Sequence, residues 1–194
     1  RGKARQQYPI ILGHEITGVV DAVGPEVARL RPGDAVVVAP LIPCDECRAC
    51  RAGDYGLCQH YSFIGSRRPG GFASTVAVPE RDSLRLPHGV DGFAPALVEP
   101  LAVGCYALAR AGAAAGDTVV VVGGGTIGLC AALMAEAAGA EVTVLDVVPD
   151  RVAHAARLGL RAHLVDAADT EPRLGSVVIE AAGSAAALHT ALRV

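Results

Sequence analysis

The sequence of 194 residues lacks the features that would direct it to a membrane or to nucleic acid. It has no run of about eighteen apolar residues and no basic segment followed by an apolar one, so we expect neither a membrane span nor a signal peptide. Its formal net charge is -3, which provides no strong positive field for nucleic acid or an anionic membrane. The 52% of hydrophobic residues suffice for a sizeable core, and we expect a cytoplasmic protein of two domains.

The chain also lacks an initiator methionine, because it begins at Arg1. It stops at Val194, soon after the fourth strand that we expect in its second half. We therefore expect an internal piece of a longer protein.

The first half of the chain consists of short β-rich runs separated by turns. Residues 16–24 and 35–40 are such runs, 31–34 form a turn, and 70–80 are expected to be another strand that is opened by glycines. Many short strands without helical periodicity predict a β-rich, barrel-like or sandwich-like domain over residues 1–93.

The second half alternates strands and helices. Strands are expected at 118–122, 141–145, near 162–165 and within 176–183, and helices at 101–113, 127–140 and near 150–158. This alternation predicts an α/β domain with a doubly wound parallel sheet over 116–194, preceded by a connecting helical segment over 94–115.

A glycine-rich turn follows the first strand of that predicted sheet. Gly123, Gly125 and Gly128 have G-x-G-x-x-G spacing, and Thr126 and Ile127 lie between the last two. The first glycine permits a tight turn, the second lets the backbone approach a pyrophosphate, and the third lets the helix pack on the strand. The helix N-terminus adds unpaired N–H groups for phosphate. We predict a dinucleotide site here, with a purely structural turn as the alternative.

An acidic residue follows at the expected distance. Asp146 ends the next strand, 23 residues after Gly123, where its carboxylate can accept hydrogen bonds from a ribose diol. The same charge repels a 2′-phosphate, so NAD is predicted over NADP. Arg151 is the one nearby cation in the sequence that would soften this preference.

Four of the six cysteines fall within fifteen residues, at Cys44, Cys47, Cys50 and Cys58. Four thiolates suit tetrahedral Zn²⁺ and leave no open position for substrate, so the predicted site is structural. The spacing differs from the two separated C-x2-C pairs of zinc ribbons and from ferredoxin patterns. Disulfides are the remaining alternative. His60 is interpreted as a loop residue.

His14 and Glu15 form a GHExxGxV pattern, and Glu99 lies in VEPLAVG. Together with the cysteine segment and the glycine turn, in this order, these motifs resemble the zinc-dependent medium-chain dehydrogenases of the alcohol dehydrogenase superfamily. The chain is most similar to their polyol branch, because Glu99 stands where simple alcohol dehydrogenases carry a cysteine. The resemblance implies a partial GroES-like catalytic domain over 1–93, with a structural-zinc lobe at 44–58, ahead of a partial Rossmann domain.

The resemblance also implies a catalytic zinc held by His14 and an upstream cysteine. Glu99 would be a ligand or lie close to the ion, and Glu15 would be a ligand or contact one of the ligands. That cysteine is absent from the sequence. Cys105 and Cys130 do not replace it, since they lie in apolar helical runs where buried thiols are expected. The implied protein is a homo-oligomer, a dimer or tetramer, that transfers hydride between a polyol or polyol phosphate and NAD. The chain alone is expected to have little turnover.

Residues 61–73 are similar to the corresponding segment of galactitol-1-phosphate dehydrogenases within that branch. Arg67 and Arg68 would then face a sugar phosphate, since guanidinium matches phosphate geometry; a solvated turn is the alternative. Two other functions stay open. One is a threonine or secondary-alcohol dehydrogenase of the same superfamily, and the other is a catalytically inactive NAD-binding protein stapled by zinc.

Overall fold

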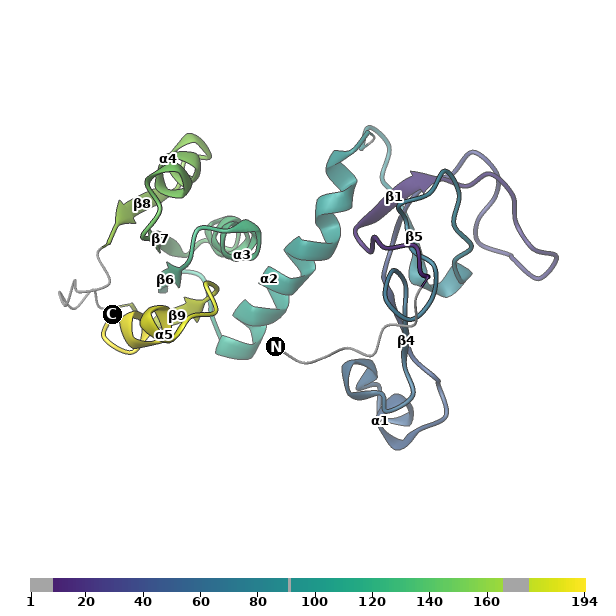
Figure 1. The fold of residues 1–194 in the computed structure, drawn as a ribbon, viewed down its shortest axis with the longest axis horizontal. Helices are drawn as coiled ribbons and strands as arrows, with labels where there is room; N and C mark the ends of the chain where they lie inside the picture. The colour runs from purple at the N-terminus through teal and green to yellow at the C-terminus, as the bar shows by residue number, and fades with distance from the viewer. Residues whose placement is uncertain (1–8, 91, 166–174) are drawn as a thin grey trace. The chain divides into compact units, whose positions relative to one another are not determined.

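The computed structural model describes residues 9–90, 92–165 and 175–194 (Figure 1). The chain divides into two compact units, of which the first ends at Glu99 and the second begins at Pro100. Each unit has its own sheets and its own core.

Short antiparallel strands build the first unit. β1 (Ile16–Val19), β2 (Ala35–Val38) and β5 (Ser83–Arg85) form a three-stranded sheet in the order β1–β2–β5. The first two strands are rich in the β-branched residues isoleucine, threonine and valine, whose side chains suit a half-buried pleated surface. Their buried residues pack with Ile64 in a small core. The two predicted runs are thus confirmed as strands, although both are shorter than the pattern indicates.

A second, two-stranded ribbon forms the stem of the cysteine segment. β3 (Leu41–Ile42) and β4 (Ser62–Phe63) pair in antiparallel fashion, so that residues 44–58 project from their ends as a lobe. We call these residues the cysteine lobe. The short helical elements of the first unit are α1 (Arg48–Arg51), η1 (Tyr55–Leu57), η2 (Glu80–Asp82) and η3 (Ala94–Leu97).

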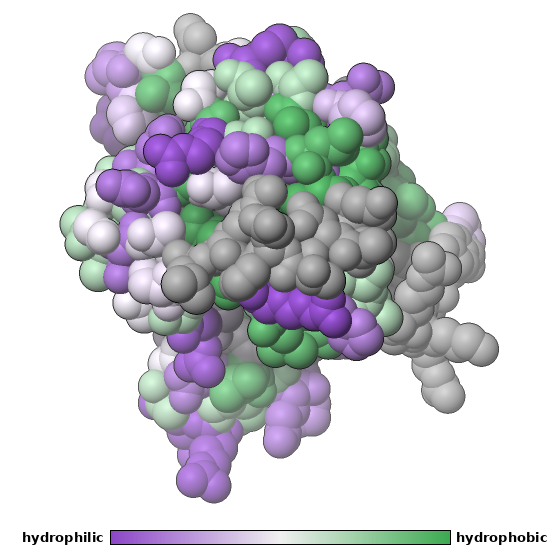
Figure 2. All heavy atoms as spheres, turned by 90° about the vertical axis from the view of Figure 1, so that its left-hand side faces the viewer, coloured by the Kyte–Doolittle hydropathy of each residue, from purple (hydrophilic) through white to green (hydrophobic). Residues whose placement is uncertain are grey.

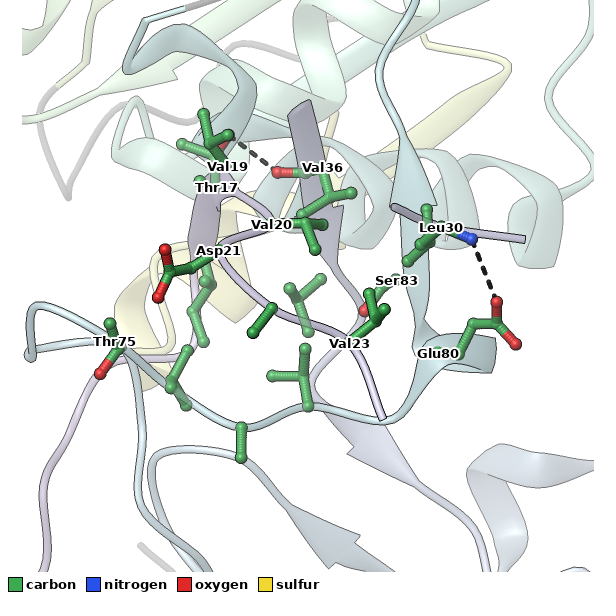
Figure 3. A pocket seen from close by; sticks show the side chains of 18 of the residues that line it. Thr17, Val19, Val20, Asp21, Val23, Leu30, Val36, Thr75, Glu80 and Ser83 are labelled. Carbon is green, nitrogen blue, oxygen red and sulfur yellow. Dashed lines mark hydrogen bonds between the residues drawn. The ribbon is translucent and has the colours of Figure 1, made fainter. Parts of the chain in front are cut away.

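The strand predicted for residues 70–80 is wrong. Val76 and Val78 do pack against the small core, so the alternating pattern is real. However, a strand also needs a hydrogen-bonded neighbour, and none of the described strand pairs includes these residues. Residues 73–78 instead line a cavity of about 550 Å³ together with β1 and β2 (Figure 3).

A parallel sheet builds the second unit. β6 (Thr118–Val122), β7 (Glu141–Asp146), β8 (Arg161–Leu164) and β9 (Val177–Glu180) are arranged in the order β8–β7–β6–β9, and every pairing is parallel. All four strands predicted from the sequence are confirmed. The helices of this unit are α2 (Val98–Ala111), whose first two residues still belong to the first unit, α3 (Thr126–Ala137), α4 (Pro149–Arg157) and α5 (Ala185–Ala191).

Helices cover both faces of this sheet. Val119 and Val121 of β6 belong to a core cluster with side chains of α2, α3 and α4, whereas Val120 and Val122 pack with side chains of α5. All four valines are at most 4% exposed, as expected for a central parallel strand. Because α3 and α5 cover opposite faces, the winding of the sheet reverses between β6 and β9. In open α/β sheets, ligands bind beside the carboxyl ends of strands at such a point.

One predicted buried thiol is wrong. Cys130 is buried in α3, but Cys105 on α2 is exposed. The residue of α2 that meets α3 is Gly104, where a Cβ would lie 2.7 Å from the backbone nitrogen of Ala131. The apolar run around Cys105 therefore does not bury every face of the helix.

Apolar side chains also reach the surface of the second unit. Leu164, Leu188 and Leu192 are 50% exposed or more, and Figure 2 shows hydrophobic groups among hydrophilic ones on one face. Scattered exposure of this kind is ordinary in folded proteins. Among the described residues, no helix combines the length and the apolar character that a bilayer span requires.

Candidate functional site

Three side chains predicted for a catalytic zinc lie together in the first unit. His14, Glu15 and Glu99 each offer one ligand atom, and these atoms all lie within 4.8 Å of one another. His14 and Glu15 immediately precede β1 and are exposed, while Glu99 lies in the first turn of α2 and is half-buried. Imidazole and carboxylate are zinc donors, so this cluster fits the predicted ion.

The cysteine lobe forms a second cluster with a different donor set. Cys44, Cys47, Cys50 and Cys58 are all thiols, and their sulfurs lie within the same 4.8 Å limit. The sulfur of Cys50 is 3.9 Å from that of Cys44 and 3.5 Å from that of Cys47. Sulfurs in a tetrahedral site with Zn–S bonds of about 2.3 Å are roughly 3.8 Å apart, so the lobe fits a zinc tetrathiolate.

Backbone N–H groups prepare two of these sulfurs as thiolates. Hydrogen bonds from the backbone, first that of Cys50, lower the pKa of the Cys47 thiol to about 6. Burial opposes ionisation of Cys58, but N–H groups outweigh it and lower its pKa; one of them is the Cys44 N–H, at 3.3 Å from the sulfur. Burial, with the neighbouring Cys47 and Cys58 thiols, raises the pKa of Cys50 to about 12, and a metal ion would favour its thiolate form.

An arginine bonds to the segment in which the cysteine lobe begins. Asp45 has a φ of 64°, a left-handed conformation that is uncommon outside glycine. The Arg81 guanidinium, from η2, forms an ion pair with the Asp45 carboxylate and donates to the Pro43 carbonyl at 3.2 Å. Arg81 thus bonds to the residues on both sides of Cys44. Sequence reasoning missed this residue, because 36 positions separate it from Asp45.

The glycine turn has the geometry that its motif predicts. Gly123 has a φ of 109°, and a Cβ on it would lie 2.7 Å from the backbone nitrogen of Ala182. A Cβ on Gly128 would lie 1.8 Å from the Gly123 carbonyl oxygen, so only glycine lets α3 pack here. Gly125, by contrast, precedes α3 with nothing within 4 Å of its Cβ position, which leaves the N-terminus of α3 open to a phosphate. Thr126 and Ile127 form the first turn of α3.

Asp146 is bonded into this turn. Its carboxylate is buried, and Oδ2 accepts from the Gly124 N–H at 2.6 Å while Oδ1 accepts from the Val148 N–H at 2.8 Å. The Arg151 guanidinium lies 3.5 Å from Oδ2. Each carboxylate oxygen can accept more than one hydrogen bond, so the group remains able to accept from a ribose hydroxyl. The contribution of Gly124 was missed, although three consecutive glycines in the sequence are a cue to it.

Of the two arginines of residues 61–73, Arg67 already has a side-chain partner. The Arg67 guanidinium lies 3.8 Å from the centre of the Tyr61 ring and donates to the Tyr61 carbonyl at 2.8 Å. Burial raises the pKa of Asp82, and the charges of Arg81 and Arg68 act against that rise, which places Arg68 in the field of this carboxyl group. Arg67 remains exposed and keeps further N–H donors, since a guanidinium carries five.

Comparison with known proteins gives two domains in the predicted order. Residues 1–88 match the alcohol dehydrogenase GroES-like domain, and residues 102–187 match the C-terminal domain of alanine dehydrogenase/PNT. Galactitol 1-phosphate 5-dehydrogenase from Escherichia coli K12 is 40% identical over 185 residues, which cover 95% of this chain and 54% of that protein. L-galactonate-5-dehydrogenase from the same strain is 43% identical over 149 residues, covering 77% and 44%.

A solved structure is also similar over nearly the whole chain. The crystal structure of a putative zinc-binding dehydrogenase from Sinorhizobium meliloti 1021, bound to NADP, has a TM-score of 0.90 and 34% identity, covering 97% of this chain and 58% of that one. The chain spans about half the length of the curated relatives it matches.

Proposed function

Because the chain belongs to the zinc-dependent medium-chain dehydrogenases, in their polyol branch, we propose that the full-length protein oxidises a secondary hydroxyl of a polyol or polyol phosphate to a ketone, with NAD as the hydride acceptor. The observation that carries the proposal is the convergence of His14, Glu15 and Glu99, which come from opposite ends of the first unit. In this proposal a GroES-like catalytic domain occupies residues 1–93, a helical segment 94–115 and a Rossmann domain 116–194.

His14 and Glu99 are the proposed ligands of the catalytic metal, with Glu15 as a further ligand or a partner that orients them. Zinc at this cluster would lower the pKa of the substrate hydroxyl and stabilise the alkoxide from which hydride leaves. The exposure of His14 and Glu15 leaves the cluster accessible to a small substrate. The contribution of these residues is to hold the reacting oxygen at one fixed place.

The proposed cofactor site is the turn from Gly123 to Gly128 with Asp146. We propose NAD over NADP because a buried carboxylate at the end of β7 repels a 2′-phosphate. Arg151 holds this carboxylate by an ion pair and is also the cation that limits the repulsion. Replacing Asp146 with serine should shift the kcat/KM ratio toward NADP, whereas Asp150→Asn, at an exposed position in the first turn of α4, should leave it unchanged.

The cysteine lobe is proposed to bind a second, structural zinc. Its four thiols fill a tetrahedral shell, so this site has no position for substrate. The full-length enzyme should therefore contain two zinc ions per chain. A content of one would instead support the inactive, zinc-stapled NAD-binding protein.

The substrate class is tested by NAD reduction with a panel of galactitol 1-phosphate, galactitol, L-galactonate and threonine. Galactitol 1-phosphate and L-galactonate are in the names of the two relatives above. A preference for the phosphate that Arg67→Gln or Arg68→Gln removes would assign these side chains to phosphate recognition. Activity on threonine alone would contradict the polyol proposal.

His14→Ala should abolish this activity and remove one zinc per chain while the cysteine lobe keeps the other. Unchanged turnover in that variant would contradict the proposed catalytic site. We also propose that the enzyme is a dimer or tetramer, which light scattering on the full-length protein tests directly.

A further inference from the structure

Two backbone segments cross immediately before His14. The residues at the crossing are Gly13, Gly65 and Gly70, which we call the glycine crossing. A Cβ on Gly65 would lie 2.4 Å from the Gly13 carbonyl oxygen, and a Cβ on Gly70 would lie 2.2 Å from the same atom. Side chains do not approach backbone atoms this closely, so each position requires glycine unless one of the two segments moves.

Hydrogen bonds lock the two segments at this crossing. The N–H groups of Gly70, Phe72 and Gly71 donate to the carbonyls of the three consecutive residues Ile11, Leu12 and Gly13, each at 2.9 Å. The carbonyls of the three residues that precede His14 are thus all hydrogen-bonded to this segment. Its position depends on the segment that runs from β4 to residue 72.

The same segment also contacts the His14 side chain. The rings of His14 and Phe63 have centroids 5.6 Å apart and planes inclined at 60°, a tilted arrangement that aromatic pairs favour. Phe63 is itself held, because it pairs with Leu41 across the ribbon and the next residue, Ile64, is completely buried. The backbone that carries this ring is therefore held in place beside the imidazole.

We propose that residues 63–72 are the positioning element of the His14 site. The glycine crossing sets the backbone in front of His14, and the Phe63 ring sets the orientation of its imidazole relative to Glu99. Phe63 and Gly70 are positioning residues, since they act through His14 rather than on the substrate. This inference rests on the proposed function in one respect, namely that His14 binds zinc.

The first test replaces Gly70 with alanine in the full-length protein. Gly70 does not have a positive φ, so the added methyl acts by collision with the backbone of the crossing, namely the Gly13 and Leu12 carbonyl oxygens and the Gly65 Cα. The matched control is Gly18→Ala on β1, where nothing lies within 4 Å of the Cβ position. Loss of groups that orient a metal ligand typically weakens metal affinity about 10–100-fold. We expect a loss in that range at the His14 cluster for Gly70→Ala and no loss for the control, measured by zinc titration against a competing chelator.

The cysteine lobe serves as an internal control for folding in this experiment. A Gly70→Ala protein that keeps its tetrathiolate zinc but loses zinc at His14 has a local defect, as the proposal requires. A variant that loses both ions has misfolded, and the ring substitutions then decide.

The second test compares Phe63→Leu with Phe63→Tyr. Leucine keeps apolar contact but removes the ring, so we expect roughly tenfold weaker zinc affinity at His14. Tyrosine keeps the ring and should restore affinity to near the wild-type value. Cobalt substituted at the His14 site adds a spectroscopic readout, because its visible bands should change in Phe63→Leu and not in Phe63→Tyr.

The outcomes separate this inference from the proposed function. If wild type holds two zinc ions and Phe63→Leu binds the second as tightly as Phe63→Tyr does, the positioning role is overturned while the proposed function stands. If wild type holds no zinc at His14, both are overturned.

Discussion

Different physical interactions stabilise the two units of this molecule internally. The second unit buries the central strand of a parallel sheet between helices on both faces, and its valines are almost inaccessible to solvent. The first unit has a small core of Ile16, Val38 and Ile64, and it adds a cluster of four thiols, ion pairs and a glycine crossing. Long apolar elements stabilise one unit by burial, whereas we expect the other, with its short strands, to depend on specific contacts and on the proposed zinc.

Metal removal should produce the largest difference between the two units in their resistance to protease. Structural zinc contributes about 10–16 kcal/mol of apparent binding free energy in zinc-finger peptides, and the cysteine lobe has little apolar core to replace it. Cys58→Ser should therefore lose the lobe zinc and make the lobe sensitive to trypsin at Arg48 and Arg51. The second unit should keep its protection, as mass spectrometry of the fragments will show.

Cys105→Ser is the matched control for this experiment. Its thiol is exposed on α2 and lies outside both donor clusters, so zinc content and protease resistance should stay at wild-type values. Equal loss of protection in both units of Cys58→Ser would contradict the comparison.

A substitution that creates a cavity beside the parallel sheet should destabilise the second unit and spare the first. Leu145 on β7 is 1% exposed, and truncating a buried leucine to alanine costs about 2–5 kcal/mol. Leu145→Ala should lower the unfolding free energy of the second unit by this amount in denaturant titrations while the lobe retains zinc. Leu192→Ala, at a residue that is 77% exposed, should change it by no more than about 0.5 kcal/mol.

The sequence predicts the second unit well because its determinants are local. Apolar runs of strand length alternate with helical runs, and the glycine turn occupies the junction that its motif requires. The cluster of four thiols in the cysteine lobe is predictable for the same reason, since all four cysteines lie within one loop. Each of these features is complete within a short window of residues.

The remaining features depend on partners that are distant in the chain. Residues 70–80 have a strand pattern, but pairing is decided by neighbours and not by the pattern. Cys105 lies in an apolar run, yet α2 turns Gly104 and not Cys105 toward α3. The glycine crossing joins positions more than fifty residues apart, such as Gly13 and Gly65. A single sequence gives no indication that these glycines meet.

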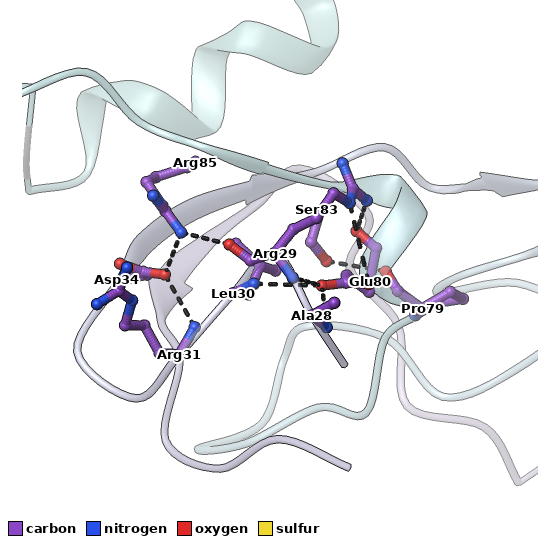
Figure 4. A network of polar contacts seen from close by, with 9 residues as sticks. All are labelled: Ala28, Arg29, Leu30, Arg31, Asp34, Pro79, Glu80, Ser83 and Arg85. Atoms are coloured by element: carbon purple, nitrogen blue, oxygen red, sulfur yellow. Dashed lines mark hydrogen bonds and ion pairs between the residues drawn. The ribbon is translucent and has the colours of Figure 1, made fainter. Parts of the chain in front are cut away.

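Acid should destabilise the first unit through Glu80 (Figure 4). One carboxylate oxygen of Glu80 accepts from three consecutive backbone N–H groups, those of Ala28, Arg29 and Leu30. These bonds, that of Arg29 first, lower the pKa of Glu80. A lowered folded-state pKa gives stability that is present above the unfolded value of about 4.3 and is lost as pH falls through the folded value.

Glu80→Gln should remove this part of the acid dependence. The neutral amide keeps an acceptor oxygen but no charge, so the variant should be less stable than wild type at pH 7 and should approach it below the folded pKa. Glu26→Gln, at an exposed carboxylate, should show the wild-type profile. Thermal melting of the first unit between pH 7 and pH 3 measures the difference, and parallel profiles for wild type and Glu80→Gln would contradict the role of Glu80.

Arg81→Gln should produce the smallest effect and refine the comparison within the first unit. The Arg81 side chain is 41% exposed and that of Asp45 56%, so solvent screens their ion pair, and exposed pairs contribute roughly 0.2–1 kcal/mol. The tetrathiolate should consequently remain occupied. Because Arg81 bonds on both sides of Cys44, its loss should instead increase the rate at which zinc passes to a chromogenic chelator, by up to about fivefold for that energy. Asp45→Asn keeps a residue that tolerates the left-handed conformation and removes the charge, but it leaves the Arg81 bond to Pro43, so its zinc transfer should be faster than that of wild type and no faster than that of Arg81→Gln. A lobe that empties at equilibrium in either variant would show that the ion pair, and not the four thiolates, determines zinc retention.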